Sequence, residues 1–197
     1  LWEKFLLAHC PDYAERYNIA PQSDILIIRA MPGNGRVGQL VRWGLIPGWA
    51  TDPAIGHKLI NARGETVADK PSFRSSFARH RCLIPATGFY EWQADEWQPV
   101  TSDGRVRKQP WYIRPAEAGE FFAFAGLLAA WTPPGGDTIV STCIITTAAN
   151  ELMAPTHDRM PVILAREHWA AWLSREQQDV PALAPLLAPA DPARLQA

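Results

Sequence analysis

Short runs of apolar and β-branched residues, separated by turn residues, recur along the chain and predict a sheet. Residues 24–29 (Asp-Ile-Leu-Ile-Ile-Arg) are typical of a buried strand, and residues 39–44 return as its hairpin partner. The turn between them, at 31–35, contains an Asn-Gly pair, which favours tight hairpins. The same pattern predicts further strands at residues 81–85, 88–92, 111–114, 121–127 and 138–146.

Helical spacing of apolar residues predicts three helices outside these strands. They lie at residues 1–7, 70–81 and 166–173. In the second of them, Phe73 and Phe77 lie on one side, which is more typical of core packing than of an exposed face.

Two segments are expected to carry little of the core. Polar residues 96–108 are typical of a hairpin tip, and the Ala/Pro/Leu-rich tail 174–197 is expected to be poorly ordered. We therefore predict a single α+β domain over residues 1–197. Its sheet should be mainly antiparallel and twisted or barrel-like, with a few flanking helices.

The composition and net charge limit the classes of partner that the protein could bind. A chain of 197 residues with 47% apolar content can bury one core. Its net charge of −1 gives no global attraction to nucleic acid or membrane, so polyanion binding would need a local basic patch. The apolar stretch 121–130 is about half the length of a bilayer span, and the start lacks a signal peptide's apolar segment. Three cysteines cannot all pair internally, so we expect reduced thiols in a cytoplasmic protein.

Glu91 lies between Tyr90 and Trp92 and has two interpretations. If it points inward, its carboxyl is partly desolvated, which would raise the pKa and suit acid–base chemistry. If the strand alternates the other way, Glu91 faces solvent and its aromatic neighbours face the core.

His157 lies in a loop bounded by Pro155 and Pro161, which would hold the imidazole in place. Asp158 or Arg159 could set its tautomer, although these two residues could equally pair with each other. A lone histidine in a loop favours a functional role only weakly.

Asn61 and Arg63 follow a short apolar pair, and together they could grip a phosphate and an adjacent sugar or carbonyl. The alternative is an Asx turn at Asn61 with a surface salt bridge from Arg63 to Glu65.

The predicted helix at 70–81 carries the local basic patch, next to a bend between Trp43 and Trp49. Basic groups interleaved with exposed aromatic rings are typical of single-stranded nucleic-acid binding. The two tryptophans could instead be packed, with the bend presenting one of them. The basic residues are Lys70, Arg74, Arg79 and Arg81.

Metal and cofactor chemistry find little support in the sequence. His80 and Cys82 are two residues apart, and no second pair with metal-ligand spacing follows. The zinc-deaminase pattern, the phosphate loop and the dinucleotide fingerprint are absent. We therefore expect no cofactor.

Five motifs, taken in their order along the chain, resemble the SRAP family, the SOS response-associated peptidases that process abasic sites in DNA. The resemblance covers about residues 17–173. The motifs are residues 16–21 (Arg-Tyr-Asn-Ile-Ala-Pro), 43–49 (Trp-Gly-Leu-Ile-Pro-Gly-Trp), 61–66 (Asn-Ala-Arg-Gly-Glu-Thr), 81–92 (Arg-Cys-Leu-Ile-Pro-Ala-Thr-Gly-Phe-Tyr-Glu-Trp) and 157–161 (His-Asp-Arg-Met-Pro).

The resemblance implies a mechanism. Family members begin Met-Cys-Gly-Arg, lose the methionine, and use the exposed cysteine against the aldehyde of an abasic site in single-stranded DNA. The α-amine forms a Schiff base at C1′ and the thiol then closes a thiazolidine ring. An α-amine has a pKa of about 8, so a useful fraction is nucleophilic at physiological pH.

The resemblance also implies roles for residues of this chain. Glu91 would manage protons at the amine, His157 would act on the sugar hydroxyl, and Asn61 would position the amino-terminal residue. Arg63 would hold a flanking phosphate. Apart from the resemblance, we expect further DNA contacts from Trp43, Trp49, Arg74, Arg79, Arg81 and Arg159.

This sequence begins at Leu1 and lacks Met-Cys-Gly-Arg. Cys10 lies just after the first predicted helix, next to Pro11, and Cys82 and Cys143 lie in predicted strands. None of them offers a free α-amine beside a thiol, so we expect the nucleophile before Leu1. Three hypotheses remain. The chain crosslinks to abasic sites, it is a cysteine peptidase acting on itself or other proteins, or it is a non-catalytic single-strand binding module. A monomer is expected, since no oligomer interface is evident.

Overall fold

The computed structural model describes residues 2–33, 35–94 and 108–197. Five of its strands form a closed ring in the order β3-β2-β5-β8-β9, and β9 pairs again with β3. Every pairing in the ring is antiparallel except that of β3 with β9. The five strands are β2 (Asp24–Ala30), β3 (Arg36–Trp43), β5 (Arg81–Ala86), β8 (Phe122–Trp131) and β9 (Ile139–Ala148). The predicted mainly antiparallel, barrel-like sheet is therefore confirmed.

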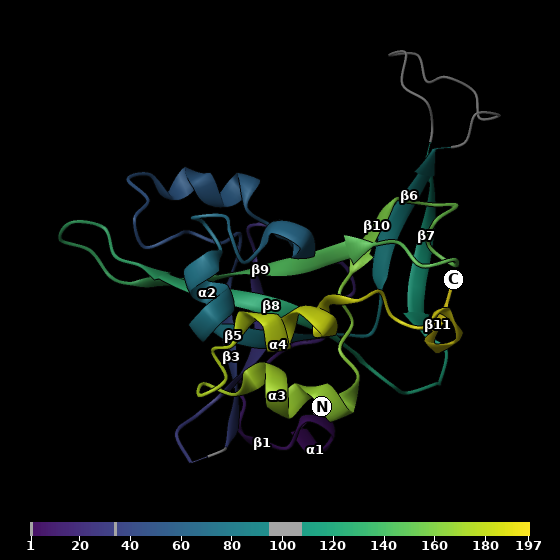
Figure 1. Cartoon of the computed structure of the whole chain (residues 1–197), viewed down its shortest axis with the longest axis horizontal. Helices are drawn as coiled ribbons and strands as arrows, with labels where there is room; N and C mark the ends of the chain where they lie inside the picture. The colour runs from purple at the N-terminus through teal and green to yellow at the C-terminus, as the bar shows by residue number, and fades with distance from the viewer. Residues whose placement is uncertain (1, 34, 95–107) are drawn as a thin grey trace.

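Three short strands extend the ring. β1 (Leu7–His9) pairs with β3, and β4 (Asn61–Arg63) and β10 (Arg159–Pro161) both pair with β9. A second sheet consists of β6 (Phe89–Ala94), β7 (Lys108–Pro115) and β11 (Leu195–Gln196). It stands at one end of the molecule, near β10 (Figure 1).

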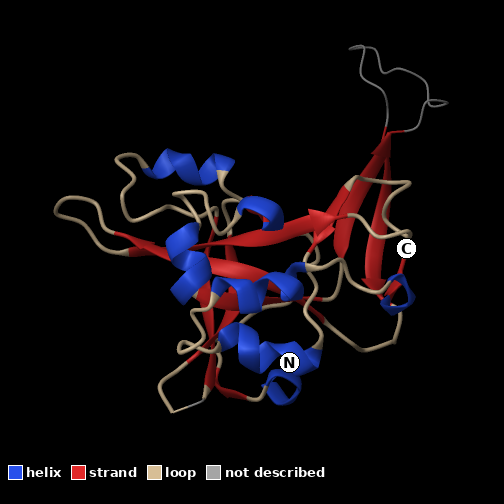
Figure 2. Cartoon of the chain, viewed as in Figure 1, coloured by secondary structure: helices blue, strands red, loops and turns tan. Residues whose placement is uncertain are grey.

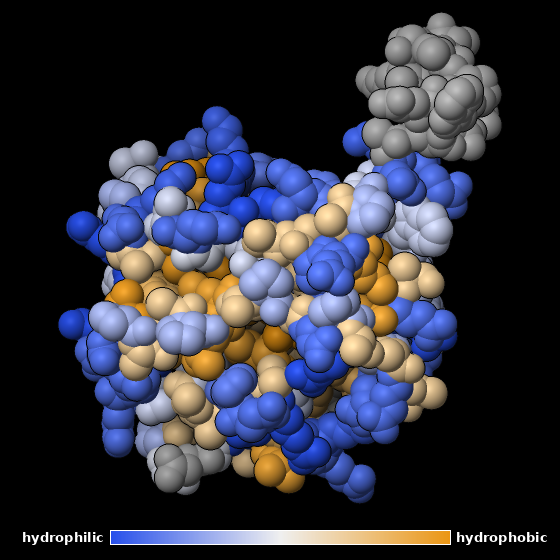
Figure 3. Space-filling view, turned by 45° about the vertical axis from the view of Figure 1, so that its right-hand side comes forward, coloured by the Kyte–Doolittle hydropathy of each residue, from blue (hydrophilic) through white to orange (hydrophobic). Residues whose placement is uncertain are grey.

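Short helices cover one side of the strands (Figure 2). Contacts join α2 to β8 and α3 to β5. Apolar side chains reach the surface across the middle of one face, with polar side chains around them (Figure 3). The helices are α1 (Trp2–Phe5), η1 (Pro53–Lys58), η2 (Gly64–Thr66), α2 (Arg74–Arg79), η3 (Arg166–His168), α3 (Trp169–Leu173), α4 (Val180–Leu183), η4 (Ala184–Leu187) and η5 (Pro192–Arg194).

The core forms on both faces of the closed sheet, because successive strand residues point to opposite faces. On β5, Leu83 packs with the helices, in a cluster that includes Phe77 and Trp172. Its neighbours Cys82 and Ile84 pack with β2, β3, β8 and β9 in a second cluster. The core interpretation of Phe73 and Phe77 is confirmed, since both side chains are buried.

Two predicted helices are shorter than expected. The first ends at Phe5 because Leu6 has a positive φ of 53°, which turns the chain into β1. Phe5 is nonetheless buried and stacks on Trp169. The second helix begins only at Arg74, after turns from Lys70 onward, and ends at Arg79.

The prediction of a poorly ordered tail is wrong. Leu183, Leu187 and Leu195 are buried, and β11 pairs with β7. Individually short apolar segments gain order here because the rest of the protein offers surfaces for them to cover. The predicted hairpin tip at 96–108 falls, apart from Lys108, outside the described residues, as does Asn34 of the predicted Asn-Gly turn.

Candidate functional site

Glu91 lies on the less exposed face of the hairpin formed by β6 and β7. Its neighbours Tyr90 and Trp92 are 41% and 52% exposed, whereas Glu91 is partly buried. The alternative of a solvent-facing Glu91 with buried neighbours is therefore wrong. Burial raises the pKa of the Glu91 carboxyl above its usual value, and the nearby imidazole of His157 is the largest opposing influence.

His157 comes from the loop between β9 and β10. The oxygen of Met153 accepts hydrogen bonds from the main-chain nitrogens of Thr156 (2.8 Å) and His157 (3.0 Å), which folds the loop tightly. The main-chain nitrogen of Arg159 donates to His157 Nδ1 at 2.9 Å. A neutral imidazole would therefore carry its proton on Nε2. When the imidazole is protonated, the Asp158 carboxylate at 3.2 Å can balance its charge.

Asn61 and Arg63 lie on one exposed face of β4, with buried Ala62 between them. β4 runs parallel to β9, and Arg63 is in register with Thr146. On the other side of β9, Thr146 is in register with Pro161 of β10. The strands thus bring the motif at 61–66 next to the motif at 157–161, although nearly a hundred residues separate them in sequence.

Arg159 joins the same two motifs directly. Its guanidinium binds both carboxylate oxygens of Glu65, at 2.9 and 3.1 Å, and donates to the side chain and main chain of Thr146. Arg159 holds the pKa of Glu65 below its usual value. Glu65 is therefore the ion-pair partner of Arg159, which contradicts the alternative of an Asp158–Arg159 pair. Two-point pairing of this kind fixes the orientation of a guanidinium.

The two tryptophans of the predicted bend differ in exposure. Trp49 is 58% exposed, and its indole nitrogen donates to Pro71 O at 3.4 Å, so it lies beside the turns that precede α2. Trp43 is partly buried and donates to Ile60 O at 2.9 Å, directly before Asn61. Trp43 is thus packed beneath β4, and the bend presents Trp49.

The basic patch of α2 is smaller than predicted. Arg74 and Arg79 are exposed, but Arg81 is only 5% exposed. The Arg81 guanidinium donates to main-chain oxygens of Phe77, Ala78, Trp172, Ser174 and Gln177. Burial lowers its pKa to about 10. This contradicts the interpretation of Arg81 as a phosphate contact, because its donors already bind the ends of two helices.

None of the cysteines has the environment of a reactive thiol. Cys10, Cys82 and Cys143 are all buried. Burial raises the pKa of Cys82 to about 12 and that of Cys143 well above its usual value. A thiolate is the nucleophilic form, so these side chains are inert near neutral pH.

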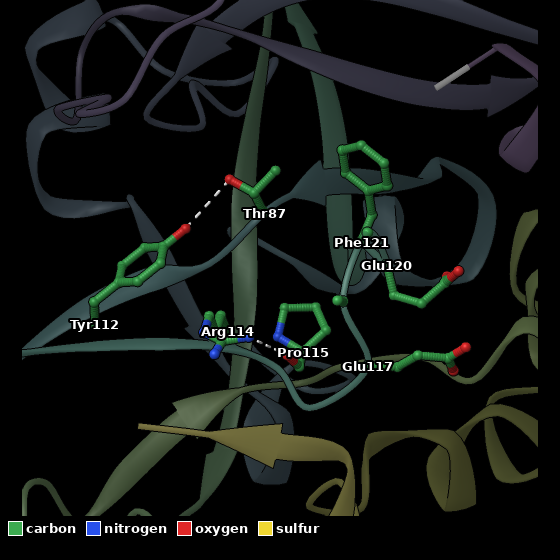
Figure 4. A pocket seen from close by; sticks show the side chains of 9 residues that line it. Thr87, Tyr112, Arg114, Pro115, Glu117, Glu120 and Phe121 are labelled. Atoms are coloured by element: carbon green, nitrogen blue, oxygen red, sulfur yellow. Dashed lines mark hydrogen bonds between the residues drawn. The ribbon is translucent and has the colours of Figure 1, made fainter.

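A cleft with a volume of about 250 Å³ lies along the second sheet, away from the predicted residues. The hydroxyl of Tyr112 points toward Thr87 Oγ1, 3.3 Å away, and Arg114, Glu117 and Phe121 line the remainder (Figure 4). We do not assign this cleft to the site, since none of the predicted site residues lines it.

Within the described ranges, no three His, Cys, Asp or Glu side chains are grouped so that they could hold a metal ion. Among those same residues, no helix is long and apolar enough to cross a membrane.

Sequence reasoning missed two contributors to this region. Thr146 carries no chemical signal in the sequence, because its role depends on β9 lying between β4 and β10. Gln93 lies two residues after Glu91, so strand alternation could have placed it on the same side.

The closed sheet and the arrangement of these motifs place the chain in a single protein family. The family described as SOS response associated peptidase (SRAP) matches residues 3–197, and the chain belongs to it.

Relatives and solved structures agree with this membership. The abasic site processing protein YoqW of Bacillus subtilis is 46% identical over 180 residues, which are 91% of this chain and 76% of YoqW. The abasic site processing protein HMCES of Xenopus tropicalis is 32% identical and matches 83% of this chain and 54% of its own. A crystal structure of a protein from Bacteroides thetaiotaomicron superposes with a TM-score of 0.77 at 30% identity, covering 89% and 72% of the two chains. One from Bordetella bronchiseptica gives 0.78 at 25% identity, with 99% and 92% covered.

Proposed function

We propose that this protein processes abasic sites in single-stranded DNA by forming a covalent bond to the sugar aldehyde. The observation that carries the proposal is that His157 lies near enough to Glu91, whose pKa is raised by burial, to influence its charge. Family membership and the names of the relatives support the substrate.

The nucleophile in this proposal is an amino-terminal cysteine before Leu1, as the family resemblance implies. Its α-amine attacks C1′ of the opened sugar, and the carbonyl oxygen leaves as water when a carbinolamine becomes a Schiff base. The thiol then adds to the C=N carbon, forming the C–S bond, and its proton passes to the nitrogen. The three buried cysteines support a nucleophile from elsewhere, because none has an accessible thiolate.

Glu91 and His157 supply the proton transfers. A carboxyl with a raised pKa can donate a proton to the departing hydroxyl and, as a carboxylate, accept one from the amine or thiol. His157 would exchange a proton with the sugar oxygen as the ring opens. Removal of an initiator methionine would use Glu91 at the same amine, so self-processing is part of the same proposal.

Several exposed groups are suited to contacts with DNA. Arg63 would contact a phosphate, and Asn61 on the same face would orient the amino-terminal residue. Arg74, Arg79 and the exposed ring of Trp49 would extend the contact along a single strand. Arg159, whose guanidinium is bound to Glu65, would act by holding the motifs at 61–66 and 157–161 together.

The test incubates the full native chain with a single-stranded oligonucleotide that carries one abasic site. A heat-stable adduct on a denaturing gel is expected, and none with undamaged DNA. Glu91→Gln and His157→Gln should each slow adduct formation by roughly 100-fold or more. Glu117→Gln and His57→Gln, at exposed positions, are matched controls. Unchanged rates for both site variants would refute the assigned roles.

The alternatives predict other outcomes. A non-catalytic module would bind the oligonucleotide without forming an adduct, and a general peptidase would cleave unrelated proteins. A chain that starts at Leu1 should bind without crosslinking. Arg63→Ala should reduce the slope of log affinity against log salt by about one, as expected for one lost phosphate contact.

A further inference from the structure

Gln93 links the two halves of the candidate site. Its amide nitrogen donates to the main-chain oxygen of Pro155 at 3.0 Å, in the loop that carries His157. Its amide oxygen accepts from the indole nitrogen of Trp111 at 2.9 Å. Trp111 can only donate, so it determines which end of the amide faces Pro155. Gln93 lies on the same strand as Glu91, two residues further along.

The loop transmits this contact to His157. Its first turn is fixed by Asn150, whose side chain accepts from the nitrogen of Met153 and donates to Ala190 O. Met153 is buried, and its oxygen binds the nitrogens of Thr156 and His157. Pro155, held by Gln93, lies within this turn, so the bond to its carbonyl restrains the main chain that carries His157 two residues later.

We propose that Gln93 is a positioning residue that sets the separation of Glu91 and His157 by tying β6 to the His157 loop. This inference rests on the proposed function for its effect on DNA, but its structural part can be tested without DNA. Gln93 touches neither the sugar nor the attacking amine, so its effect should fall on the rate of bond formation and leave DNA affinity unchanged.

The charges around Glu91 provide the DNA-independent measurement. His157 and Lys108 lower its pKa, whereas Asp158 raises it. Replacing His157 by glutamine should therefore raise the Glu91 pKa in the wild-type background, as measured by carbon-13 NMR of the carboxyl. In a Gln93→Leu background the same replacement should have less than half this effect, because the imidazole is no longer held nearby.

The crosslinking experiment uses the full native chain. Gln93→Leu should lower the rate at saturating DNA by roughly 10- to 100-fold, the scale of a misplaced reacting group. The DNA concentration giving half the maximal rate should not change. Gln109→Leu is the matched control, because Gln109 faces Gln93 in register on β7 and its side-chain bond is to neighbouring Pro110.

A second variant gives a signature that simple loss of stability would not produce. In Gln93→Glu the protonated side chain can donate to Pro155 O and accept from Trp111, as glutamine does. The carboxylate cannot donate and would repel that oxygen. The crosslinking rate of Gln93→Glu relative to wild type should therefore recover as the pH falls through the pKa of the new carboxyl. If Gln93→Leu does not fold, Gln93→Met, which also lacks the amide, replaces it in both measurements.

Equal effects of His157→Gln on the Glu91 pKa in both backgrounds would overturn the proposal, whether or not the protein crosslinks to DNA. A change in half-saturation without a change in maximal rate would overturn it as well. Absence of any wild-type adduct would refute the proposed function alone, since the pKa comparison would still decide the role of Gln93.

Discussion

Replacing Arg81 by methionine should destabilise the protein by about 2–4 kcal/mol. The Arg81 guanidinium binds five main-chain oxygens, at the end of α2, at the end of α3 and in the segment that follows α3. Carbonyls at helix ends have no partner within the helix, so the side chain supplies donors that the backbone lacks. Methionine fills much of the same space and donates nothing.

The expected destabilisation follows from which hydrogen bonds of Arg81 are buried. The bonds to Phe77 O and Trp172 O are buried, and an unpaired buried carbonyl costs about 1–3 kcal/mol. The other three bonds are partly exposed, so water can replace the guanidinium there. Relief of the desolvated charge, visible in the pKa lowered to about 10, offsets part of the loss.

Thermal or urea unfolding of Arg81→Met against wild type measures the effect. For a protein of this size, 2–4 kcal/mol corresponds to a fall in Tm of roughly 4–16 °C. Arg79→Met, at an exposed position of the same helix, should change Tm by little. Below its Tm, Arg81→Met should keep the salt dependence of DNA binding. A Tm within 1 °C of wild type, or a salt slope reduced by about one, would refute the structural role.

Three further changes have directions set by the structure. Glu65→Gln should destabilise by less than about 1 kcal/mol, since the pair with Arg159 is partly exposed. In the folded state Arg159 lowers the pKa of Glu65 below its ordinary value of 4.5. The stabilisation is therefore present above that pH and is lost as the pH falls further. The free energies of unfolding of wild type and variant should accordingly converge in acid. Glu91→Gln should raise Tm at neutral pH and not in acid, because the raised pKa means that the folded protein disfavours the carboxylate; an equal Tm difference at pH 4 and 8 would contradict this. Leu187→Ala should cost about 2–3 kcal/mol in urea unfolding, whereas a truly disordered tail would give no change.

The sequence alone identified the strands and motifs that depend on local residue patterns. Continuous runs of apolar and β-branched residues identified β2, β5 and β9, because a strand that is buried on both faces is apolar at successive positions. The motifs around Asn61, Glu91 and His157 were likewise visible without a structure, since each joins a polar side chain to Gly, Pro or aromatic residues.

Only the tertiary structure decided which way each side chain points and what it meets. Glu91 had two equally consistent orientations. Phe89, two residues earlier on β6, packs against Phe122 and Phe124 of β8, so its side of the strand, which Glu91 shares, is the less exposed one. Arg81 looked like part of a basic patch and is instead buried among carbonyls that come from residues up to 96 positions away. The tail gained its order by covering surfaces that no local pattern reveals. Burial and hydrogen bonding depend on contacts between distant segments, so the sequence determined the strands and the site chemistry, and the fold determined their partners.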